Sequence, residues 1–272
     1  MRGLFTSGIN DVMMESGIDP DGIIGVSAGA AFGCNYKSRQ PGRVIRYTKR
    51  YADDSRFCGK ASLLRTGDIF NAAFAYHTIP NYLDKFDNAA FEANPMEFYL
   101  VATDVVTGLP YYRQCNTGGD EFFEWVRASA SMPLVSRIVR MGGRKLLDGG
   151  MTDSIPLEYM EKAGYDRNIV ILTQPEGYVK QQTSALPLIK LVYRKYPRLV
   201  RAMARRHEMY NAETAYVKQA EMEGRALVIR PDAPLPIGHI SHDREEIQRV
   251  YDLGRRTGER YIDRIKEFWN LS

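Results

Sequence analysis

The chain has 272 residues and a formal net charge of +4, with 44% hydrophobic and 26% charged residues, values that are ordinary for a soluble globular protein with one main domain. No stretch is apolar for long enough to span a bilayer, and the first residues lack the layout of a secretory signal. The three cysteines, Cys34, Cys58 and Cys115, have no spacing typical of a zinc site or a disulfide framework. We therefore expect a cytoplasmic protein whose contact with membranes, if any, is peripheral.

The first predicted elements are a helix, a strand and a second helix. Apolar residues recur with helical spacing from Leu4 to Glu15, and Gly17 follows as a plausible stop. The apolar pair Ile23 and Ile24 predicts a short strand, and the small residues after it predict a buried helix.

The junction between that strand and that helix has the sequence G-x-S-x-G. Small residues on both sides of a serine allow a sharp turn that exposes the hydroxyl at a helix N-terminus, where developing negative charge is favoured. The motif therefore predicts serine-nucleophile hydrolysis with Ser27 as the nucleophile. Its five residues are Gly25, Val26, Ser27, Ala28 and Gly29.

Strands alternate with helices through most of the remaining chain, which predicts a layered α/β fold. Buried strands are predicted at Glu97–Thr103, Arg144–Leu147, Asn168–Leu172 and Ala226–Ile229. Helices are predicted at Phe122–Ser131, Pro156–Ala163, Arg201–Glu223 and Asp243–Phe268. Residues 39–94, which are rich in Tyr, Phe, Asn and Asp, predict a mostly helical lobe that is a candidate lid.

A serine hydroxyl needs a base to take its proton, and several groups compete for that role. An α/β-hydrolase triad would use His207, His239 or His242. However, that fold places an oxyanion loop and several strands ahead of the elbow, and only 26 residues precede Ser27. The alternative is that His77 and His207 are surface or capping residues and that residues 238–242 form a turn.

Asp148 is a better candidate for the base. It follows the predicted strand Arg144–Leu147, and strand ends are where α/β folds gather chemistry. Gly149 and Gly150 follow it, and their flexible backbone allows close approach to another loop. Taken alone, Asp-Gly-Gly is equally typical of a solvated turn.

An early G-x-S-x-G followed by D-G-G at this separation resembles the patatin-like phospholipases, lipid acyl hydrolases with a Ser-Asp dyad. Ala102-Thr103-Asp104 with Thr107-Gly108 resembles the core strand and turn of that family, and residues 128–133 resemble its helix before the aspartate strand. The resemblance implies a three-layer α/β/α sandwich with a mostly parallel central sheet. It also implies that Ser27 attacks an ester carbonyl and that Asp148 accepts its proton.

From Tyr193 onward the sequence looks like a bacterial branch of that family with its own carboxyl-terminal extension. We expect a catalytic domain at 1–230 and a helical extension packed on it at 231–272. The implied substrate is an acyl-ester lipid, and no cofactor or metal is required, although Asp153 lies near the proposed site in sequence. A short-chain esterase or thioesterase is the alternative enzyme.

The beginning of the chain departs from the family pattern. The family usually carries G-G-G-x-R-G ahead of its first helix, and this sequence begins with Met1-Arg2-Gly3. Losing one oxyanion donor typically costs about a hundred- to a thousandfold in rate. The candidate oxyanion residues that remain are Arg2, Gly3 and Ala28.

Two interpretations of this beginning follow. Either the start is wrongly assigned and a longer form carries the glycine-rich loop, or the chain is a weakly active or catalytically silent fold that binds lipid or a partner. A sheet without the strand that precedes that loop would have unpaired backbone groups or a closed gap. We therefore expect lower stability than in a version extended by that strand.

The segment 177–207 is strongly basic, with eight Lys and Arg and no Asp or Glu. Within it, Leu188, Leu191, Val192 and Tyr193 predict the apolar part of an amphipathic surface that docks on anionic lipid. The neighbouring cations are Lys190, Arg194, Lys195, Arg198 and Arg201. The alternative is an ordinary solvated basic face. Nucleic acid is not an expected partner, because the segment has few aromatic residues and no recognised reading motif.

Overall fold

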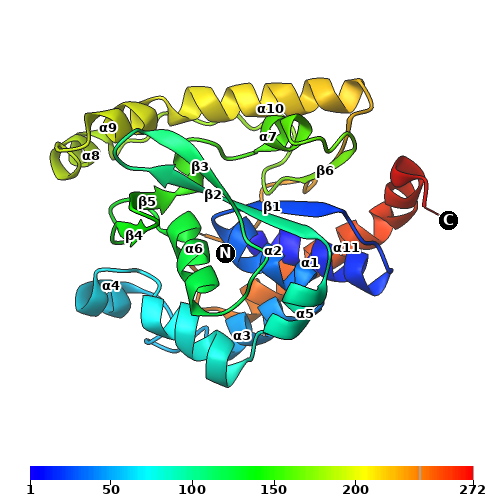
Figure 1. The fold of residues 1–272 in the computed structure, drawn as a ribbon, viewed down its shortest axis with the longest axis horizontal. Helices are drawn as coiled ribbons and strands as arrows, with labels where there is room; N and C mark the ends of the chain where they lie inside the picture. The colour runs from blue at the N-terminus through cyan, green and yellow to red at the C-terminus, as the bar shows by residue number, and fades with distance from the viewer. Residues whose placement is uncertain (239, 272) are drawn as a thin grey trace.

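The computed structural model describes residues 1–238 and 240–271, and in it two sheets lie between layers of helices (Figure 1). The larger sheet contains β1 (Gly22–Val26), β2 (Glu97–Asp104), β3 (Leu109–Gln114), β4 (Val139–Met141) and β5 (Arg144–Asp148). The smaller sheet contains β6 (Asn168–Ile171) and β7 (Ala226–Ile229).

Helices cover both faces of these sheets, so the expected three-layer α/β/α architecture is confirmed (Figure 1). One layer contains α7 (Leu157–Lys162), α8 (Leu186–Val192), α9 (Pro197–Ala204) and α10 (Arg206–Met222). The other contains α1 (Gly3–Glu15), α2 (Ala28–Lys37), α3 (Arg43–Arg50), α5 (Asn88–Ala93) and α11 (Arg244–Trp269). The described elements also include α4 (Lys60–Thr66), the π-helix η1 (Phe74–Leu83), α6 (Asp120–Ala130) and the 3₁₀ turn η2 (Gly149–Met151).

Strand β2 is the centre of the larger sheet, and two strands share one of its edges. β1 pairs with β2 as far as Val101, and β5 pairs with it from Ala102 onward. The backbone amide of Glu97 bonds to the Asp21 carbonyl ahead of β1, and that of Val105 bonds to Lys145 of β5. Because alternate residues of a strand direct their backbone groups to opposite edges, these two odd-numbered positions place β1 and β5 on the same edge. The end of β1 therefore meets the end of β5.

The larger sheet is mixed rather than mostly parallel. β1 runs parallel to β2, whereas the β2–β3, β2–β5 and β4–β5 pairs are antiparallel. The separate β6–β7 pair is parallel. The expectation of a parallel sheet therefore holds for two pairs and is wrong for the rest. The physical reason is that β2–β3 and β4–β5 are hairpins, and a hairpin makes an antiparallel pair.

Most predicted elements are present, with two kinds of exception. The strand patterns correspond to β1, β2, β5, β6 and β7. The sequence pattern does not predict β3, which is largely exposed and contains Pro110, or β4, which has three residues. The helix predicted at 201–223 is interrupted at Arg205, where α9 ends and α10 begins. Residues 39–94 contain α3, α4, η1 and α5, and their role as a lid remains a prediction.

The C-terminal helix α11 packs on the N-terminal helix α1. Gly254 of α11 lies so close to α1 that an added Cβ atom would overlap the carbonyl oxygen of Phe5. The Tyr251 hydroxyl donates to the Asp11 carboxylate at 2.6 Å. Leu235 and Ile237, from the loop before α11, belong to the same hydrophobic core as α1. The boundary proposed between 1–230 and 231–272 remains a prediction.

One edge of β1 and one edge of β6 have no partner strand among residues 1–238 and 240–271. Both strands line the same cavity instead. Tyr165, just before β6, lies against Gly22 at the beginning of β1, where an added Cβ atom would be 2.7 Å from the tyrosine oxygen. The two strands therefore start at the same end of this cavity, and the two sheets do not join across it.

Helices of the described chain are too short or too polar to cross a membrane.

Candidate active site

Ser27 lies at a strained turn between β1 and α2. Its φ and ψ angles are 56° and −119°, which a residue with a side chain rarely adopts. A Cβ atom on Gly25 would lie 2.5 Å from the backbone of Gly29 and Ala30, so the turn can close only with glycine at 25. Gly29, in contrast, has open space where a Cβ atom would be. The two glycines of the motif are therefore not equivalent.

Ser129 of α6 holds the turn in place, a role that the sequence pattern does not reveal. The Ser27 amide donates to the Ser129 hydroxyl oxygen at 3.0 Å. That hydroxyl donates in turn to the carbonyl oxygen of Val101 at 2.6 Å, where β1 stops pairing with β2. Ser129 is fully buried. The link joins residues 102 positions apart, and only a three-dimensional view could have found it.

Asp148 ends β5, where the shared edge of β2 brings it to the end of β1. Its amide donates to the Ser131 carbonyl at 2.8 Å, and its own carbonyl accepts from the Thr103 hydroxyl at 2.8 Å. Its carboxylate accepts from the Gly150 amide at 2.8 Å. A Cβ atom on Gly149 would overlap the Val101 carbonyl oxygen, so glycine is required at the next position. The Asp-Gly-Gly segment is thus a buried, fixed turn and not a solvated one.

Burial is the largest influence on Asp148, and it raises the pKa of this carboxyl above its usual value. Three smaller influences lower the pKa: a hydrogen bond with the Ser27 side chain, the bond from the Gly150 amide, and the charge of Arg206. The structure thus brings Ser27 and Asp148 together, as the resemblance implies. A carboxylate with a raised pKa is a stronger proton acceptor than an exposed aspartate.

Two helix N-termini meet beside Ser27. α1 begins at Gly3 and α2 begins at Ala28, and a Cβ atom on Gly3 would lie 2.9 Å from the Ala28 Cβ atom. The first amides of a helix have no partner inside the helix, and they point toward the positive end of the helix dipole. Arg2 lines the same cavity. Gly3 and Ala28 are therefore neighbours next to Ser27, and Arg2 precedes Gly3 on the cavity lining.

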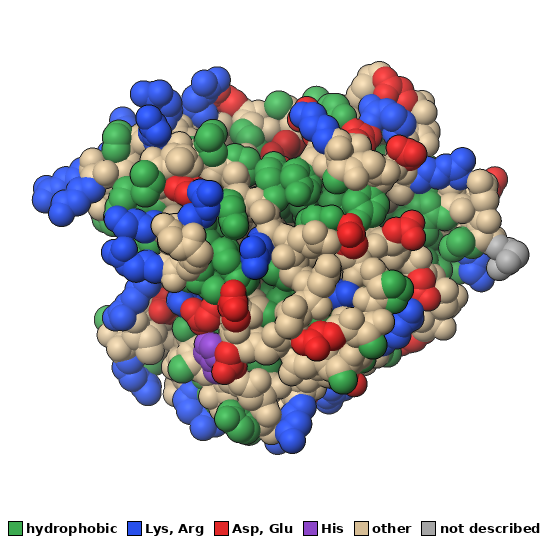
Figure 2. All heavy atoms as spheres, in the orientation of Figure 1, with side chains coloured by type: hydrophobic (Ala, Val, Ile, Leu, Met, Phe, Trp, Pro, Cys, Tyr) green, Lys and Arg blue, Asp and Glu red, His purple; other side chains and the backbone are tan. Residues whose placement is uncertain are grey.

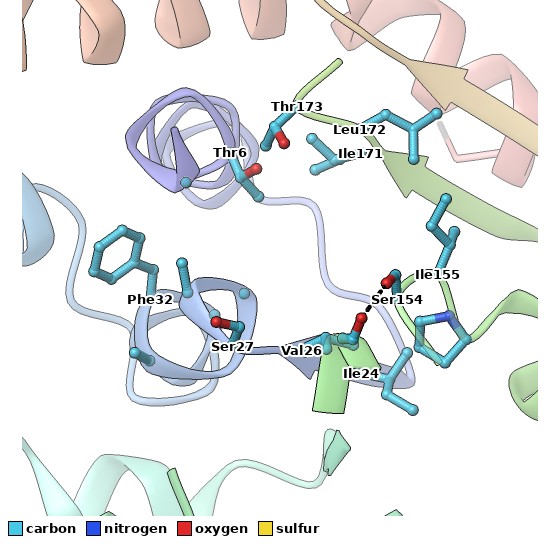
Figure 3. Close-up of a pocket in the computed structure, with 18 of the residues that line it drawn as sticks. Thr6, Ile24, Val26, Ser27, Phe32, Ser154, Ile155, Ile171, Leu172 and Thr173 are labelled. Atoms are coloured by element: carbon cyan, nitrogen blue, oxygen red, sulfur yellow. Dashed lines mark hydrogen bonds between the residues drawn. The ribbon is translucent and has the colours of Figure 1, made fainter. Parts of the chain in front are cut away.

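A cavity of about 1360 Å³ opens beside Ser27 and Asp148. Figure 3 shows Ser27 at the end of β1, with Thr6 of α1 and residues 171–173 across the open space from it. Much of the lining is apolar, including Ile24, Val26, Phe32, Ile155, Ile171 and Leu172. Tyr47, Phe57, Phe70 and Tyr76, from the predicted helical lobe, line it as well.

The other wall of the cavity brings charged residues that the motifs do not indicate. Arg206, the first residue of α10, donates from Nε to the Gly150 carbonyl at 2.6 Å. Lys180 also lines the cavity, and so does His207, whose buried Nδ1 atom has no hydrogen-bond partner among the described residues. Sequence analysis assigns Lys180 and Arg206 only to a basic segment, because their position depends on the packing of α10 against the Asp148 loop.

The histidines proposed for a triad are separated in the structure. His207 lines the cavity, but no hydrogen bond to Ser27 or Asp148 is formed within the described chain. His242 lies near Gly59 and contacts the Ala52 carbonyl through Nδ1 at 2.6 Å. His77 contacts Asp120 and Glu124. His239 lies outside the described residues.

Asp153 belongs to a buried pair of carboxyl groups rather than to a metal cluster. It accepts from the Tyr112 hydroxyl at 2.6 Å, and it interacts with Glu213, which itself accepts from the Ser154 and Ile155 amides. Burial and the charge of Asp153 raise the pKa of Glu213 to about 8. In the portion of the chain described here, no group of three or more His, Cys, Asp or Glu residues is arranged to hold a metal ion.

The basic segment forms a surface around α8 and α9. Figure 2 shows Lys and Arg side chains gathered at the upper left, where these helices lie in Figure 1. Leu188, Leu191 and Val192 are 51%, 65% and 53% exposed. The sequence pattern predicts Tyr193 on this surface, and that prediction is wrong: Tyr193 is buried, and its hydroxyl oxygen accepts from the Leu134 amide at 3.0 Å. It points inward because it lies on the same face of the helix as buried Ile189.

Two family models match parts of this chain. A family described as Patatin-like phospholipase matches residues 1–160, and a family described as a domain of unknown function (DUF6363) matches residues 196–270. YjjU, an uncharacterized protein of Escherichia coli K12, is 26% identical, and the match covers 96% of this chain and 74% of that protein.

Fungal lysophospholipases are also similar. Lysophospholipase nte1 of Aspergillus niger and lysophospholipase NTE1 of Coccidioides immitis are each 25% identical, and the matches cover 99% and 97% of this chain. The chain spans 18% and 17% of those proteins. The patatin match alone covers more than half of the chain, and the protein therefore belongs to the patatin-like phospholipase family.

Proposed function

We propose that this protein is a serine lipid acyl hydrolase of the phospholipase A type that works through a Ser27–Asp148 dyad. Membership of the family supports lipid hydrolysis in general. The observation that carries the finer proposal is the meeting of β1 and β5 on one edge of β2, because it places a strained serine beside a buried carboxylate at the mouth of a large cavity.

The reaction has two steps. In the first, Asp148 accepts the hydroxyl proton of Ser27 as the serine oxygen bonds to the ester carbonyl carbon, and the leaving alcohol departs with that proton. In the second, Asp148 accepts a proton from water, the hydroxide oxygen bonds to the acyl carbon, and Ser27 recovers its proton as the fatty acid leaves. Covalent catalysis of this kind divides one difficult displacement into two easier ones.

The negative charge on the carbonyl oxygen would be stabilised by the amides of Gly3 and Ala28. Each is the first residue of its helix, and the two lie beside Ser27. The Ser27 amide itself is engaged with Ser129, so it is not available for this purpose. Helix N-terminal amides suit an oxyanion, because their dipoles are already oriented when charge develops.

The size and lining of the cavity favour a long acyl chain. Ligand pockets commonly have volumes of about 300–1,000 Å³, and this cavity has about 1360 Å³ with many apolar residues in its wall. The alternative, a short-chain esterase or thioesterase, predicts that rate does not rise with chain length. Hydrolysis of p-nitrophenyl esters from two to sixteen carbons separates the two: we expect kcat/KM to increase with chain length.

We also propose that the surface around α8 docks on anionic lipid. Its outer residues Leu188, Leu191 and Val192 are exposed among cations, while Ile189 on its inner face lines the cavity. The same helix would therefore connect the membrane to the site. Lys190→Glu with Arg194→Glu should weaken binding to phosphatidylserine vesicles several-fold and leave binding to neutral vesicles unchanged. Charge-independent binding would contradict this part of the proposal.

Labelling of Ser27 by a fluorophosphonate, located by mass spectrometry, tests the activated nucleophile directly. We expect labelling of Ser27 in the wild-type protein, none in Ser27→Ala, and strongly slowed labelling in Asp148→Asn. His242→Ala is a matched control, because His242 lies away from the cavity. A folded wild-type protein that is not labelled would instead support the alternative of a catalytically silent fold that binds lipid or a partner.

A further inference from the structure

Two cations lie beside the dyad, and the acidic groups nearest to them, Asp148 for Arg206 and Glu213 for Lys180, form no salt bridge with them among the described residues. Lys180 and Arg206 both line the cavity, and both are half-buried. Among the residues that the structure describes, neither forms a salt bridge with a carboxylate. Removing a cation from water without such a partner is costly. Two half-buried cations without a salt bridge therefore indicate that a negatively charged ligand binds to them beside the dyad.

The chain holds both cations in fixed positions. Arg206 is fixed by its bond to the Gly150 carbonyl, two residues beyond Asp148. Lys180 is fixed through its backbone, because its amide donates to the Asn211 side chain at 2.9 Å and its carbonyl accepts from the same side chain at 3.1 Å. Its ammonium group lies 4.4 Å from the centre of the Tyr210 ring. These contacts direct two positive charges toward one region next to the nucleophile.

The surrounding groups leave this region positive at neutral pH. Burial and the charges of Arg206 and Arg2 lower the pKa of Lys180 to about 8. The acidic group that faces Lys180 is Glu213, and burial and Asp153 raise its pKa to about 8. Glu213 is therefore largely protonated at pH 7, while Lys180 is still largely charged. The other titratable groups that face Lys180 are Tyr178 and Tyr210.

His207 offers a further donor on the lining of the cavity. It follows Arg206 in α10 and lines the cavity, and its buried Nδ1 atom has no partner in the described chain. An imidazole N–H, an ammonium group and a guanidinium group form a donor set suited to a phosphate, which has several acceptor oxygens and a negative charge. Carbonyl or hydroxyl ligands would not compensate the two charges.

We propose that Lys180 and Arg206, with His207 beside them, form a binding site for the phosphate of a lipid headgroup, so that the substrate is a phosphate-bearing acyl ester. The inference rests on the proposed hydrolase function for its biological meaning. It gives a role to Arg206 and His207, which belong to the matched domain of unknown function, and to Lys180, which lies outside both matched regions. The headgroup would lie against these cations beside the dyad, with the ester at Ser27.

Binding to a catalytically dead protein tests the site without any requirement for hydrolysis. Calorimetric titration of the Ser27→Ala protein with sn-glycerol 3-phosphate should show saturable binding, and glycerol should not bind. Adding Lys180→Met or Arg206→Gln should weaken the affinity about tenfold or more, because each removes a charge-assisted contact. Arg205→Gln is the matched control, since Arg205 is exposed and pairs with Glu208, and it should leave the affinity unchanged.

Several outcomes would overturn the proposal. One is no saturable binding of sn-glycerol 3-phosphate to folded Ser27→Ala protein, and another is equal weakening by Arg205→Gln and Lys180→Met. Inorganic phosphate distinguishes a headgroup site from a simple phosphate-ion site: we expect weaker binding of the free ion, and equal affinity would contradict the headgroup assignment. Affinity should also fall as pH rises from 7 to 9, because Lys180 loses its charge and Glu213 gains one.

Activity measurements separate this inference from the proposed function. For a lysophospholipid and a monoacylglycerol with the same acyl chain, Lys180→Met should lower the ratio of their kcat/KM values about tenfold. If Ser27 is not labelled by fluorophosphonate but glycerol phosphate binds as described, the hydrolase proposal fails and the phosphate site stands. If both esters are hydrolysed and the ratio does not change in Lys180→Met, the phosphate site fails and the hydrolase proposal stands.

Discussion

The two walls of the cavity are built in different ways. On the nucleophile side, Ser27 and Asp148 are positioned by backbone contacts so close that a methyl group at Gly25 or Gly149 would collide with them. The second wall is formed beside the dyad by Lys180 and Arg206, which reach the cavity on long side chains from the segment before α8 and from α10, respectively. In the proposed function, the first wall holds the reacting groups. Substitutions that change the charges of the second wall should leave the nucleophile in position.

The two walls also differ in the contacts and in the part of the sequence on which they depend. The positions of Ser27 and Asp148 depend on a few short-range contacts around the Val101 carbonyl, where Ser129 donates and Gly149 approaches. The charges of the second wall come from a region that the patatin match does not include. Substitutions in the first wall should therefore abolish activity or lower stability. Substitutions in the second wall should alter the preference among substrates and the pH dependence of kcat/KM. The predictions below test that division.

The largest expected effect is that of Asp148→Asn on the nucleophile wall. An asparagine keeps the size of the side chain and can accept from the Gly150 amide, but it cannot take the proton of Ser27. We expect kcat to fall about a thousandfold or more, as is typical when a general base is lost. Thermal melts should show that the variant remains folded. Retention of more than a tenth of the wild-type activity would show that Asp148 is not the base.

The next effect concerns the two glycines of the serine motif. Gly25→Ala should lower the free energy of unfolding by about 3 kcal/mol, because the new methyl group meets the backbone of Gly29 and Ala30. Gly29→Ala meets nothing and should raise helix stability by about 0.5–1 kcal/mol. Urea unfolding of both variants measures the difference. Similar free energies for the two would mean that the turn relaxes more easily than its geometry suggests.

A smaller gain in stability is expected if an added strand joins β1 to β6. A designed apolar strand that ends in a glycine-rich loop and is fused ahead of Met1 could pair with the open edges of β1 and β6. We expect the melting temperature to rise by about 5 °C and Ser27 to be labelled faster. A flexible Gly/Ser extension of equal length is the control and should change neither. Equal melting temperatures for the two extensions would show that the edges of β1 and β6 do not pair with an added strand.

The smallest effect is a change in pH dependence produced from the second wall. The proposed mechanism requires ionised Asp148, so it predicts that kcat/KM falls as pH decreases through the pKa of that carboxyl. The charge of Arg206 lowers this pKa, and burial raises it more strongly. Arg206→Gln should therefore move the acid limb to higher pH for a neutral ester, and Arg205→Gln should not. An unchanged limb in Arg206→Gln would mean that the two walls are electrically independent.

The residues of the first wall have local sequence signals and those of the second do not, for a physical reason. Ser27 and Asp148 stand in local motifs, since a tight turn demands glycine nearby, and their pairing follows from a family resemblance. Ser129 acts across 102 positions and leaves no local pattern. The position of Arg206 in the cavity depends on how α10 packs against the loop after β5, and a local sequence pattern does not show this packing.

The strands also differ in how far the local sequence predicts them. Strands with buried apolar runs, such as β2 and β7, are predictable, because burial on both faces requires those residues. β3 is largely exposed and β4 is short, so neither has an apolar run to detect. Without these hairpin strands, the order and direction of the sheet could not be derived. The burial of Tyr193 is not predictable either, because composition does not reveal which side of a short helix is covered.

The unpartnered edge of β1 has a consequence for backbone exchange with solvent. Ile23 and Gly25 direct their amides toward β2, because they share the edge of Asp21, whose carbonyl bonds to Glu97. Ile24 and Val26 direct theirs into the cavity. Deuterium should therefore replace hydrogen much faster at residues 24 and 26 than at 23 and 25, although all four belong to one strand. Any molecule that fills the cavity along this edge would slow the two fast positions and leave the two slow ones unchanged.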